Sequence, residues 1–239
     1  LSLADGFAAL NRGDIATAGE ACKQALAANQ KHVPAHFLVG LVALEGKQRQ
    51  VAHEAFKSVV TLDRNHAAAW AHLAKLNVGE GRIAAAESAL REVRRIQPGD
   101  PMVIELTGTV LNSLGEYEAA ELFFERAHQM VPQSPSALMN LGNVRVFLGK
   151  IDEAVALFKR AIELEPNSAQ CHWGLANSEK AKDDTHIKTM QGLIDSGRQS
   201  KRSQGFLHYA IGKENEDLGN WADAFSAFPQ GAKAPTRNS

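Results

Sequence analysis

Residues with the types and spacing needed for phosphate or catalytic chemistry are scarce in this chain of 239 residues. A phosphate-binding loop needs a strand, a loop rich in glycine and serine, and the start of a helix, whose free amides bind the anion. The Gly-Lys pairs that begin at Gly46, Gly149 and Gly212 lack the spacing of such a loop. Sequence separation alone also defines no Ser/His/Asp or Cys/His set. The sequence therefore predicts no catalytic residue and no cofactor.

The chain has nine histidines, and histidine is a common metal ligand. The best pair is His32 and His36, whose spacing would bring both imidazoles to one face of a helix. Pro34 lies between them and interrupts the helical hydrogen-bond ladder. His32 and His66 occupy equivalent corners one repeat apart, which indicates ordinary surface polarity. We therefore predict no metal site.

Charge and hydropathy limit the classes of partner. The formal net charge is −1, and the basic cluster of Arg91, Arg94 and Arg95 is interleaved with Glu87 and Glu92, as on a solvated helix face. No apolar run approaches the roughly eighteen residues of a membrane helix. These features argue against nucleic acid and membrane insertion and favour a protein or peptide partner.

The two cysteines, Cys22 and Cys171, are far apart in sequence. Cys22 takes the place of a large apolar residue in the repeat described next, so a buried, unpaired thiol is expected there. We predict no disulfide and reducing, cytoplasmic surroundings.

Beyond single side chains, the sequence is organised by a period of thirty-four residues, best seen between Ser134 and Asn167. This stretch contains two apolar helical faces, separated at Gly149 and ended by Pro166. The recurring positions are the prolines Pro98, Pro132 and Pro166; the alanines Ala18, Ala52, Ala86, Ala120 and Ala154; and the turn glycines Gly13, Gly81, Gly115 and Gly149, with Gly46 one residue early. A small residue of the first helix recurs as Gly6, Gly40, Ala74, Gly108 and Gly142, and a large residue of the second helix as Cys22, Phe56, Leu90, Phe124 and Phe158.

This pattern resembles the tetratricopeptide repeat (TPR), with Trp70-x2-Leu73-Ala74 and Gly115-Glu116-Tyr117 as its best local matches. The resemblance implies an all-α fold, a right-handed superhelical solenoid of antiparallel helix pairs, in which the first helices, called helices A, line a concave groove. We predict five regular units over 1–168, an irregular sixth over 169–204, a truncated seventh over 205–232 and a disordered tail over 233–239.

The sixth and seventh units depart from the period. Asp183-Asp184-Thr185 replaces the turn glycine, Lys188 replaces the small alanine, and residues 196–203 form a polar, linker-like run. Pro229 is expected to shorten the last helix.

The segment from Thr185 to Arg237 resembles the end of the repeat region in bacterial TPR-sulfotransferases. The discriminating matches are Lys213, Asp217 and Phe225, together with the altered sixth unit. The resemblance implies a catalytic domain beyond Ser239. Because the chain opens at Leu1, inside a repeat, we also expect a preceding segment.

In the TPR family, specific helix A positions face the groove. Carried over residue by residue, they predict a peptide-binding groove that includes Phe37, Leu41, Lys75, Asn143, Trp173, Asn177, Lys180, Tyr209 and Lys213. The asparagine amides would bind main-chain groups, Trp173 and Tyr209 would offer flat apolar area, and the lysines would favour an acidic segment.

Three functions stay open. The first is an interaction scaffold, which would be the substrate-selecting region of a sulfotransferase. The second is an enzyme whose repeats form part of the active site, and the third is a free-standing assembly adaptor.

Overall fold

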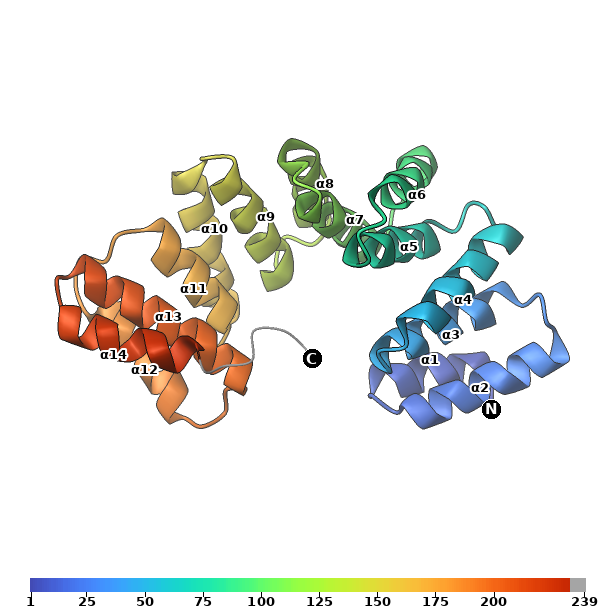
Figure 1. The fold of residues 1–239 in the computed structure, drawn as a ribbon, viewed down its shortest axis with the longest axis horizontal. Coiled ribbons are helices and arrows are strands. Elements are labelled where there is room, and N and C mark those ends of the chain that lie inside the picture. The colour runs from blue at the N-terminus through green and yellow to red at the C-terminus, as the bar shows by residue number, and fades with distance from the viewer. Residues whose placement is uncertain (233–239) are drawn as a thin grey trace. The chain divides into compact units, whose positions relative to one another are not determined.

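The computed structural model describes residues 1–232, so the tail predicted over 233–239 lies outside the described residues. The described part contains fourteen α-helices and no strand (Figure 1). The all-α prediction is confirmed.

The chain divides into two compact units, Leu1–Glu116 and Tyr117–Ser239. Unit 1 contains α1 (Leu3–Asn11), α2 (Ile15–Ala28), α3 (Val33–Glu45), α4 (Arg49–Leu62), α5 (Ala67–Gly79), α6 (Ile83–Ile96) and α7 (Pro101–Ser113). Unit 2 contains α8 (Tyr117–Met130), α9 (Pro135–Phe147), α10 (Ile151–Leu164), α11 (Ala169–Ser178), α12 (Thr185–Asp195), α13 (Lys201–Asp217) and α14 (Trp221–Ala232).

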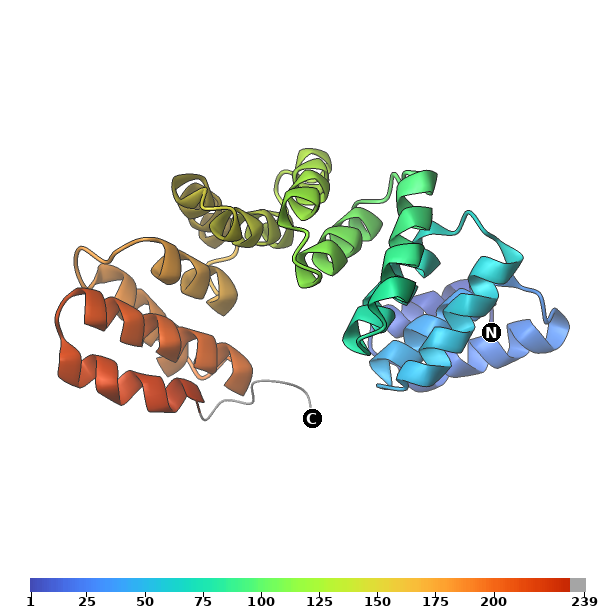
Figure 2. The ribbon, with the colours of Figure 1, turned by 45° about the horizontal axis from the view of Figure 1, so that its top comes forward.

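The helices follow the sequence period closely. Helices A from α3 to α11 begin 34 residues apart, at Val33, Ala67, Pro101, Pro135 and Ala169. The second helices of the pairs, called helices B, do the same from α2 to α12, at Ile15, Arg49, Ile83, Tyr117, Ile151 and Thr185. The pairs α1–α2, α3–α4, α5–α6, α9–α10 and α13–α14 pack as hairpins, and α13 and α14 lie side by side in both ribbon views (Figures 1 and 2).

Side-chain caps fix where most helices A begin. Asp100 accepts a hydrogen bond from an amide of the first turn of α7, and Ser134 does the same in α9. His32 and His66 perform this role in α3 and α5. His32 Nδ1 accepts a hydrogen bond from the Ala35 amide, and His66 Nδ1 accepts one from the Ala69 amide. The interpretation of these two histidines as ordinary surface polarity was therefore wrong, since each one caps a helix.

The turn between the helices of a pair needs one residue with positive φ. Gly13, Gly81, Gly115 and Gly149 have φ between 71° and 79°, as their spacing predicts. In the second repeat, between α3 and α4, Gly46 has a φ of −75°, and Lys47 takes the left-handed conformation instead. The glycine that stands one residue early in sequence is thus not the residue that turns the chain.

Large rings of helices B fill the space left by glycines of helices A. A Cβ atom added to Gly142 would lie 2.8 Å from the ring of Phe158, and one added to Gly174 would lie 2.7 Å from it. Phe158 is fully buried, so its ring is held between α9 and α11. The ring of Phe56 fits against Gly40 in the same way.

The sixth helix pair is irregular, as the sequence predicts. Helix α11 has 10 residues where α9 has 13, and α12 has 11 where α10 has 14. Between them, residues 179–184 form no helix. Two bonds from α13 hold this segment: Lys213 Nζ donates to the Glu179 carbonyl at 3.1 Å, and Asp217 Oδ2 accepts from the Ala181 amide at 3.0 Å.

One expectation about this part of the chain was wrong. The polar run 196–203 is not a linker throughout, because α13 begins at Lys201, where the Ser200 side chain caps the helix through the Ser203 amide. Pro229 lies inside α14, which continues past it to Ala232, the last described residue, and has 12 residues there where α10 has 14. Packing explains the continuation: the ring of Phe228 lies against Gly212, and the ring of Tyr209 lies against Gly231, on either side of the proline.

Candidate peptide-binding surface

In unit 1 the predicted groove residues differ in environment. The Phe37 ring is partly buried, 5.6 Å from the centroid of Phe56 and 4.6 Å from that of His66. Leu41 is also partly buried, whereas Lys75 is exposed. Phe37 therefore contributes mainly to the packing between the second and third helix pairs.

In unit 2 three side chains from α11 and α13 form a group here called the aromatic patch: Trp173 and Arg202, which are exposed, and Phe206, which is partly buried against the core. The ring centroids of Trp173 and Phe206 are 5.9 Å apart, with an edge-to-face angle of 62°. The Arg202 guanidinium lies 5.9 Å from the Phe206 centroid, within the range of a cation–π interaction. Trp173 keeps 38% of its surface exposed, so the patch presents flat apolar area beside a positive charge.

The two predicted asparagines lie on helices A of unit 2. Asn177 follows Trp173 by one turn of α11 and donates from Nδ2 to the Trp173 carbonyl at 2.8 Å. One amide hydrogen is therefore used within the helix, and the amide oxygen of Asn177 stays exposed. Asn143 is half-buried in α9. Binding of main-chain groups by the two amides stays a prediction.

Tyr209 and Lys213 are less accessible to a peptide than the sequence analysis predicts. The Tyr209 ring packs against α14, 6.4 Å from the centroid of Phe228, so the neighbour of Trp173 is Phe206 instead. The Lys213 ammonium bonds Asp217 at 2.6 Å as well as the Glu179 carbonyl. Although burial raises the pKa of Asp217, the bonds from Lys213 and the Ala181 amide outweigh it and hold that pKa below its ordinary value.

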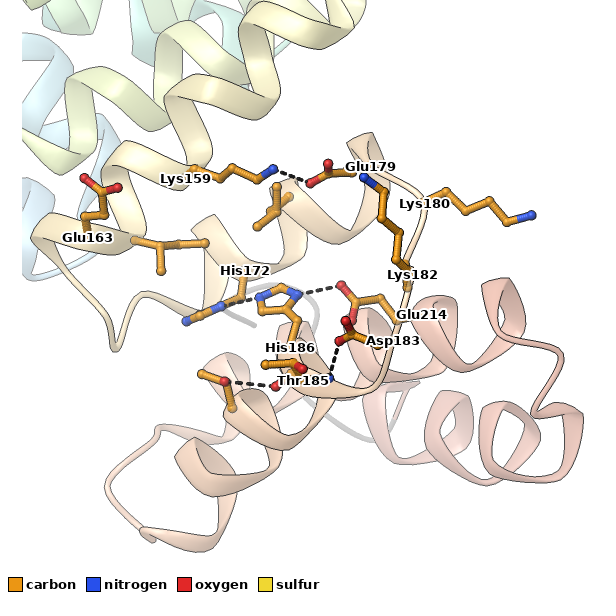
Figure 3. A pocket seen from close by; sticks show the side chains of 14 residues that line it. Lys159, Glu163, His172, Glu179, Lys180, Lys182, Asp183, Thr185, His186 and Glu214 are labelled. Atoms are coloured by element: carbon orange, nitrogen blue, oxygen red, sulfur yellow. Dashed lines mark hydrogen bonds and ion pairs between the residues drawn. The ribbon is translucent and has the colours of Figure 1, made fainter.

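Lys180 is exposed and, within residues 1–232, forms no ion pair. It is one of fourteen residues that line a cavity of about 590 Å³ at the irregular sixth unit (Figure 3). The cavity lies between α10, α11, α12 and the segment 179–184. On its rim Lys159 and Glu179 form an ion pair at 2.7 Å.

Three further residues line the same cavity, His172, His186 and Glu214, and the sequence analysis singled out none of them. Figure 3 shows His186 of α12 between His172 of α11 and Glu214 of α13. His172 Nδ1 lies 2.7 Å from His186 Nε2, and His186 Nδ1 lies 2.5 Å from Glu214 Oε1. Burial lowers the pKa of His172, against the opposing effect of its bond to the Pro166 carbonyl. His172 stands 102 residues, or three repeat periods, after Trp70. This spacing is the sequence feature that could have shown that the two residues share a repeat position.

Among residues 1–232 no group of three or more His, Cys, Asp or Glu side chains is placed to hold a metal ion. Cys22 and Cys171 are buried free thiols, and burial raises the pKa of both. No helix of the described part is long and apolar enough to cross a membrane.

The sequence model of the tetratricopeptide repeat matches residues 43–108 and 111–178, together more than half of the chain. The chain therefore belongs to the tetratricopeptide repeat family. No curated protein sequence matches it.

Solved structures share the fold at low identity. The structure of pilF from Pseudomonas aeruginosa is 21% identical, with a TM-score of 0.63 over 82% of this chain and 88% of that one. YrrB, described as a TPR protein with an unusual peptide-binding site, is 16% identical, with a TM-score of 0.56 over 87% and 97%. A human IFIT1 dimer with m7Gppp-AAAA is 17% identical, with a TM-score of 0.74 over 98% of this chain and 58% of that chain.

Proposed function

We propose that this chain is an interaction scaffold that binds a peptide or protein segment on the helix A face of unit 2. The aromatic patch is the observation that carries the proposal. Tryptophan and arginine are enriched among the residues that carry most of the binding energy of interfaces. Tryptophan also buries a large area. Asn177, one turn from Trp173, adds an exposed amide oxygen that accepts a main-chain hydrogen bond.

The charges around the patch favour an acidic segment. Arg202 contacts the Phe206 ring and, like Lys180, forms no ion pair with any residue of the described chain. Lys213, which sequence reasoning assigned to this role, is neutralised by Asp217. Of the two lysines predicted for the groove of unit 2, Lys180 is therefore unpaired, and Arg202 of the aromatic patch adds a second cation. An acidic peptide with one aromatic or long aliphatic side chain would fit this surface.

A peptide-array screen tests this proposal. Acidic, basic and neutral peptides, each with and without an aromatic residue, are incubated with the wild-type chain and with the Asn143→Ala/Asn177→Ala double variant. We expect the wild type to retain acidic peptides with an aromatic residue, and the double variant to retain them less well, because it lacks the amides that bind the main chain.

A capped oligoadenylate is included in the screen, because the similar IFIT1 structure contains one. Retention of the oligonucleotide but of no peptide would reject the peptide proposal. Equal retention of every peptide by both chains would reject the assignment of the asparagines.

The sulfotransferase resemblance is a separate proposal. Two of its discriminating residues, Lys213 and Asp217, hold the segment 179–184 in place. Their presence is therefore explained by the packing of the sixth repeat, without a sulfotransferase domain. Reading the parent gene beyond Ser239 tests it. A strand followed by a loop rich in glycine and serine would support a sulfotransferase, whereas an immediate stop codon would favour the free-standing adaptor.

A further inference from the structure

Three cations gather where the chain enters α13: Arg198, Lys201 and Arg202, here called the basic edge. All three side chains are exposed. None of them forms an ion pair with another residue of the part of the chain that the structure describes. The whole chain has a net charge of −1, yet residues 193–206 contain these three cations and one acid, Asp195, which gives this stretch a net charge of +2.

A basic cluster is often neutralised by acids of its own helix or of the next one, and α6 shows this. Arg94 pairs with Glu116 at 3.0 Å, and Arg95 pairs with Glu92 at 2.8 Å. The basic edge has no such partner among the described residues, so its charge is available to another molecule.

The loop that carries the basic edge is held in place. Gln199 Nε2 donates to the Asn167 carbonyl at 3.2 Å, which joins this loop to the one between α10 and α11. The Ser200 side chain accepts a hydrogen bond from the Ser203 amide at 3.1 Å and so fixes the start of α13. Arg198 lies three residues before Lys201, and three residues span at most about 10 Å. This distance is close to the Debye length at physiological salt, so the charges of the edge act together on an anion.

The basic edge is continuous with the aromatic patch. Arg202 belongs to both, because its guanidinium lies 5.9 Å from the centroid of Phe206, one turn later in α13. The Phe206 ring in turn lies 5.9 Å from that of Trp173. The segment 179–184, which follows the end of α11, contains two lysines and three acids, so it has no excess of positive charge. The positive charge beside the patch is therefore concentrated at the start of α13.

We propose that the segment bound on unit 2 carries its acidic residues as an uninterrupted run next to its aromatic residue. The aromatic side chain packs on Trp173, and the run of acids lies over the basic edge. One exposed ion pair contributes little to binding, whereas three together contribute about tenfold in affinity. This inference rests on the proposed function and adds the order of residues that the partner must have.

Cations beside aromatic rings also suit single-stranded nucleic acid, in which successive bases stack on successive rings. The patch offers one exposed ring, because Phe206 is partly buried and meets Trp173 edge to face, at an angle of 62°. Successive bases therefore have no second ring to stack on within the patch. This geometry favours a peptide, and an oligonucleotide is included in the test.

Fluorescence anisotropy with labelled peptides at about 0.05 M and about 0.5 M salt tests the proposal. Two peptides share one composition: a tryptophan, three glutamates and six glycine or serine residues. The glutamates adjoin the tryptophan in one peptide, and the six small residues separate them in the other, over about 20 Å when extended. Each peptide is made with the acids before and after the tryptophan, because the surface fixes the side on which the acids lie and not the direction of the peptide chain.

In one of the two directions, we expect the wild type to bind the adjoining peptide about tenfold more tightly than the separated one at low salt, and within about threefold at high salt, because salt screens exposed ion pairs. The variant Arg198→Gln/Lys201→Gln/Arg202→Gln should bind both peptides equally. The matched control is Lys31→Gln/Arg49→Gln/Lys57→Gln, which removes the same charge from exposed positions of unit 1 and should discriminate as the wild type does.

Equal affinities of the wild type for the adjoining and separated peptides in both directions would overturn this inference and leave the proposed peptide surface in place. Binding of no peptide at all would overturn the proposed function as well. Tighter binding of a single-stranded oligoadenylate than of any peptide, lost in the variant of the basic edge, would assign the edge to nucleic acid. If that variant fails to fold, the comparison of the two peptides on the wild type still decides.

Discussion

At the scale of single residues, His72 shows how burial makes a side chain sensitive to pH. In unit 1 the His72 ring stacks on Phe56 at 4.7 Å and an angle of 6°. Its Nδ1 is buried and has no hydrogen-bond partner among the described residues. Burial, reinforced by the positive charge of Lys75, lowers the pKa of His72 to about 4. The stacked ring is therefore neutral in the folded chain at physiological pH.

This neutrality predicts loss of stability in acid. The unfolded chain protonates His72 below about pH 6.5, whereas the folded chain does so only near pH 4, so stability is complete above 6.5 and falls as the pH approaches 4. From pH 7 to pH 5 we expect a loss of about 2 kcal/mol in the free energy of unfolding. His72→Phe keeps an aromatic ring on Phe56 and should lose about that much less, as measured by urea denaturation followed by circular dichroism. An equal pH dependence in both chains would contradict this assignment.

At the scale of elements, much of the helix pattern could be predicted from the period, because glycine, alanine and proline occupy positions where backbone geometry or close approach leaves few alternatives. The exceptions are places where tertiary contacts outweigh local preference. Pro229 stays within α14 because Phe228 and Gly231 pack on α13. Lys213 pairs with Asp217 one turn later in α13, which its i,i+4 spacing could have indicated, whereas its bond to the Glu179 carbonyl depends on the early end of α11. The hydrogen bonds of His186 to His172 and to Glu214 join residues 14 and 28 positions apart, which no local pattern reveals.

Two glycine-to-alanine substitutions distinguish the effect of close packing on stability from the effect of helix propensity. Gly174→Ala would bring a Cβ within 2.7 Å of the Phe158 ring, which is itself held by Gly142. We expect a cost of about 1–3 kcal/mol from overpacking, which exceeds the gain in helix propensity. The control is Gly192→Ala in α12, where an added Cβ meets no atom within 4 Å. It should stabilise the chain by about 0.5–1 kcal/mol, because alanine favours a helix. Thermal unfolding of both variants gives the signs, and stabilisation by Gly174→Ala would refute the packing assignment.

At the scale of the whole molecule, the chain is a repeat protein whose two compact units offer different surfaces. In unit 1 the predicted groove residue Phe37 is part of an aromatic cluster with Phe56, His66 and His72. In unit 2 the aromatic patch leaves Trp173 and the unpaired Arg202 accessible to a partner. We therefore propose that recognition of an acidic segment lies on unit 2.

The most direct test of that assignment is the affinity of an acidic, aromatic peptide from the screen for three chains: wild type, Trp173→Ala and Trp221→Ala. Trp221 lies on α14 and is 66% exposed, so its removal controls for the loss of an exposed tryptophan. Removing a central interface tryptophan costs about 2 kcal/mol or more, so Trp173→Ala should weaken the affinity by about thirtyfold while Trp221→Ala leaves it within threefold. Equal affinities for wild type and Trp173→Ala, or a greater loss with Trp221→Ala, would contradict binding at the aromatic patch.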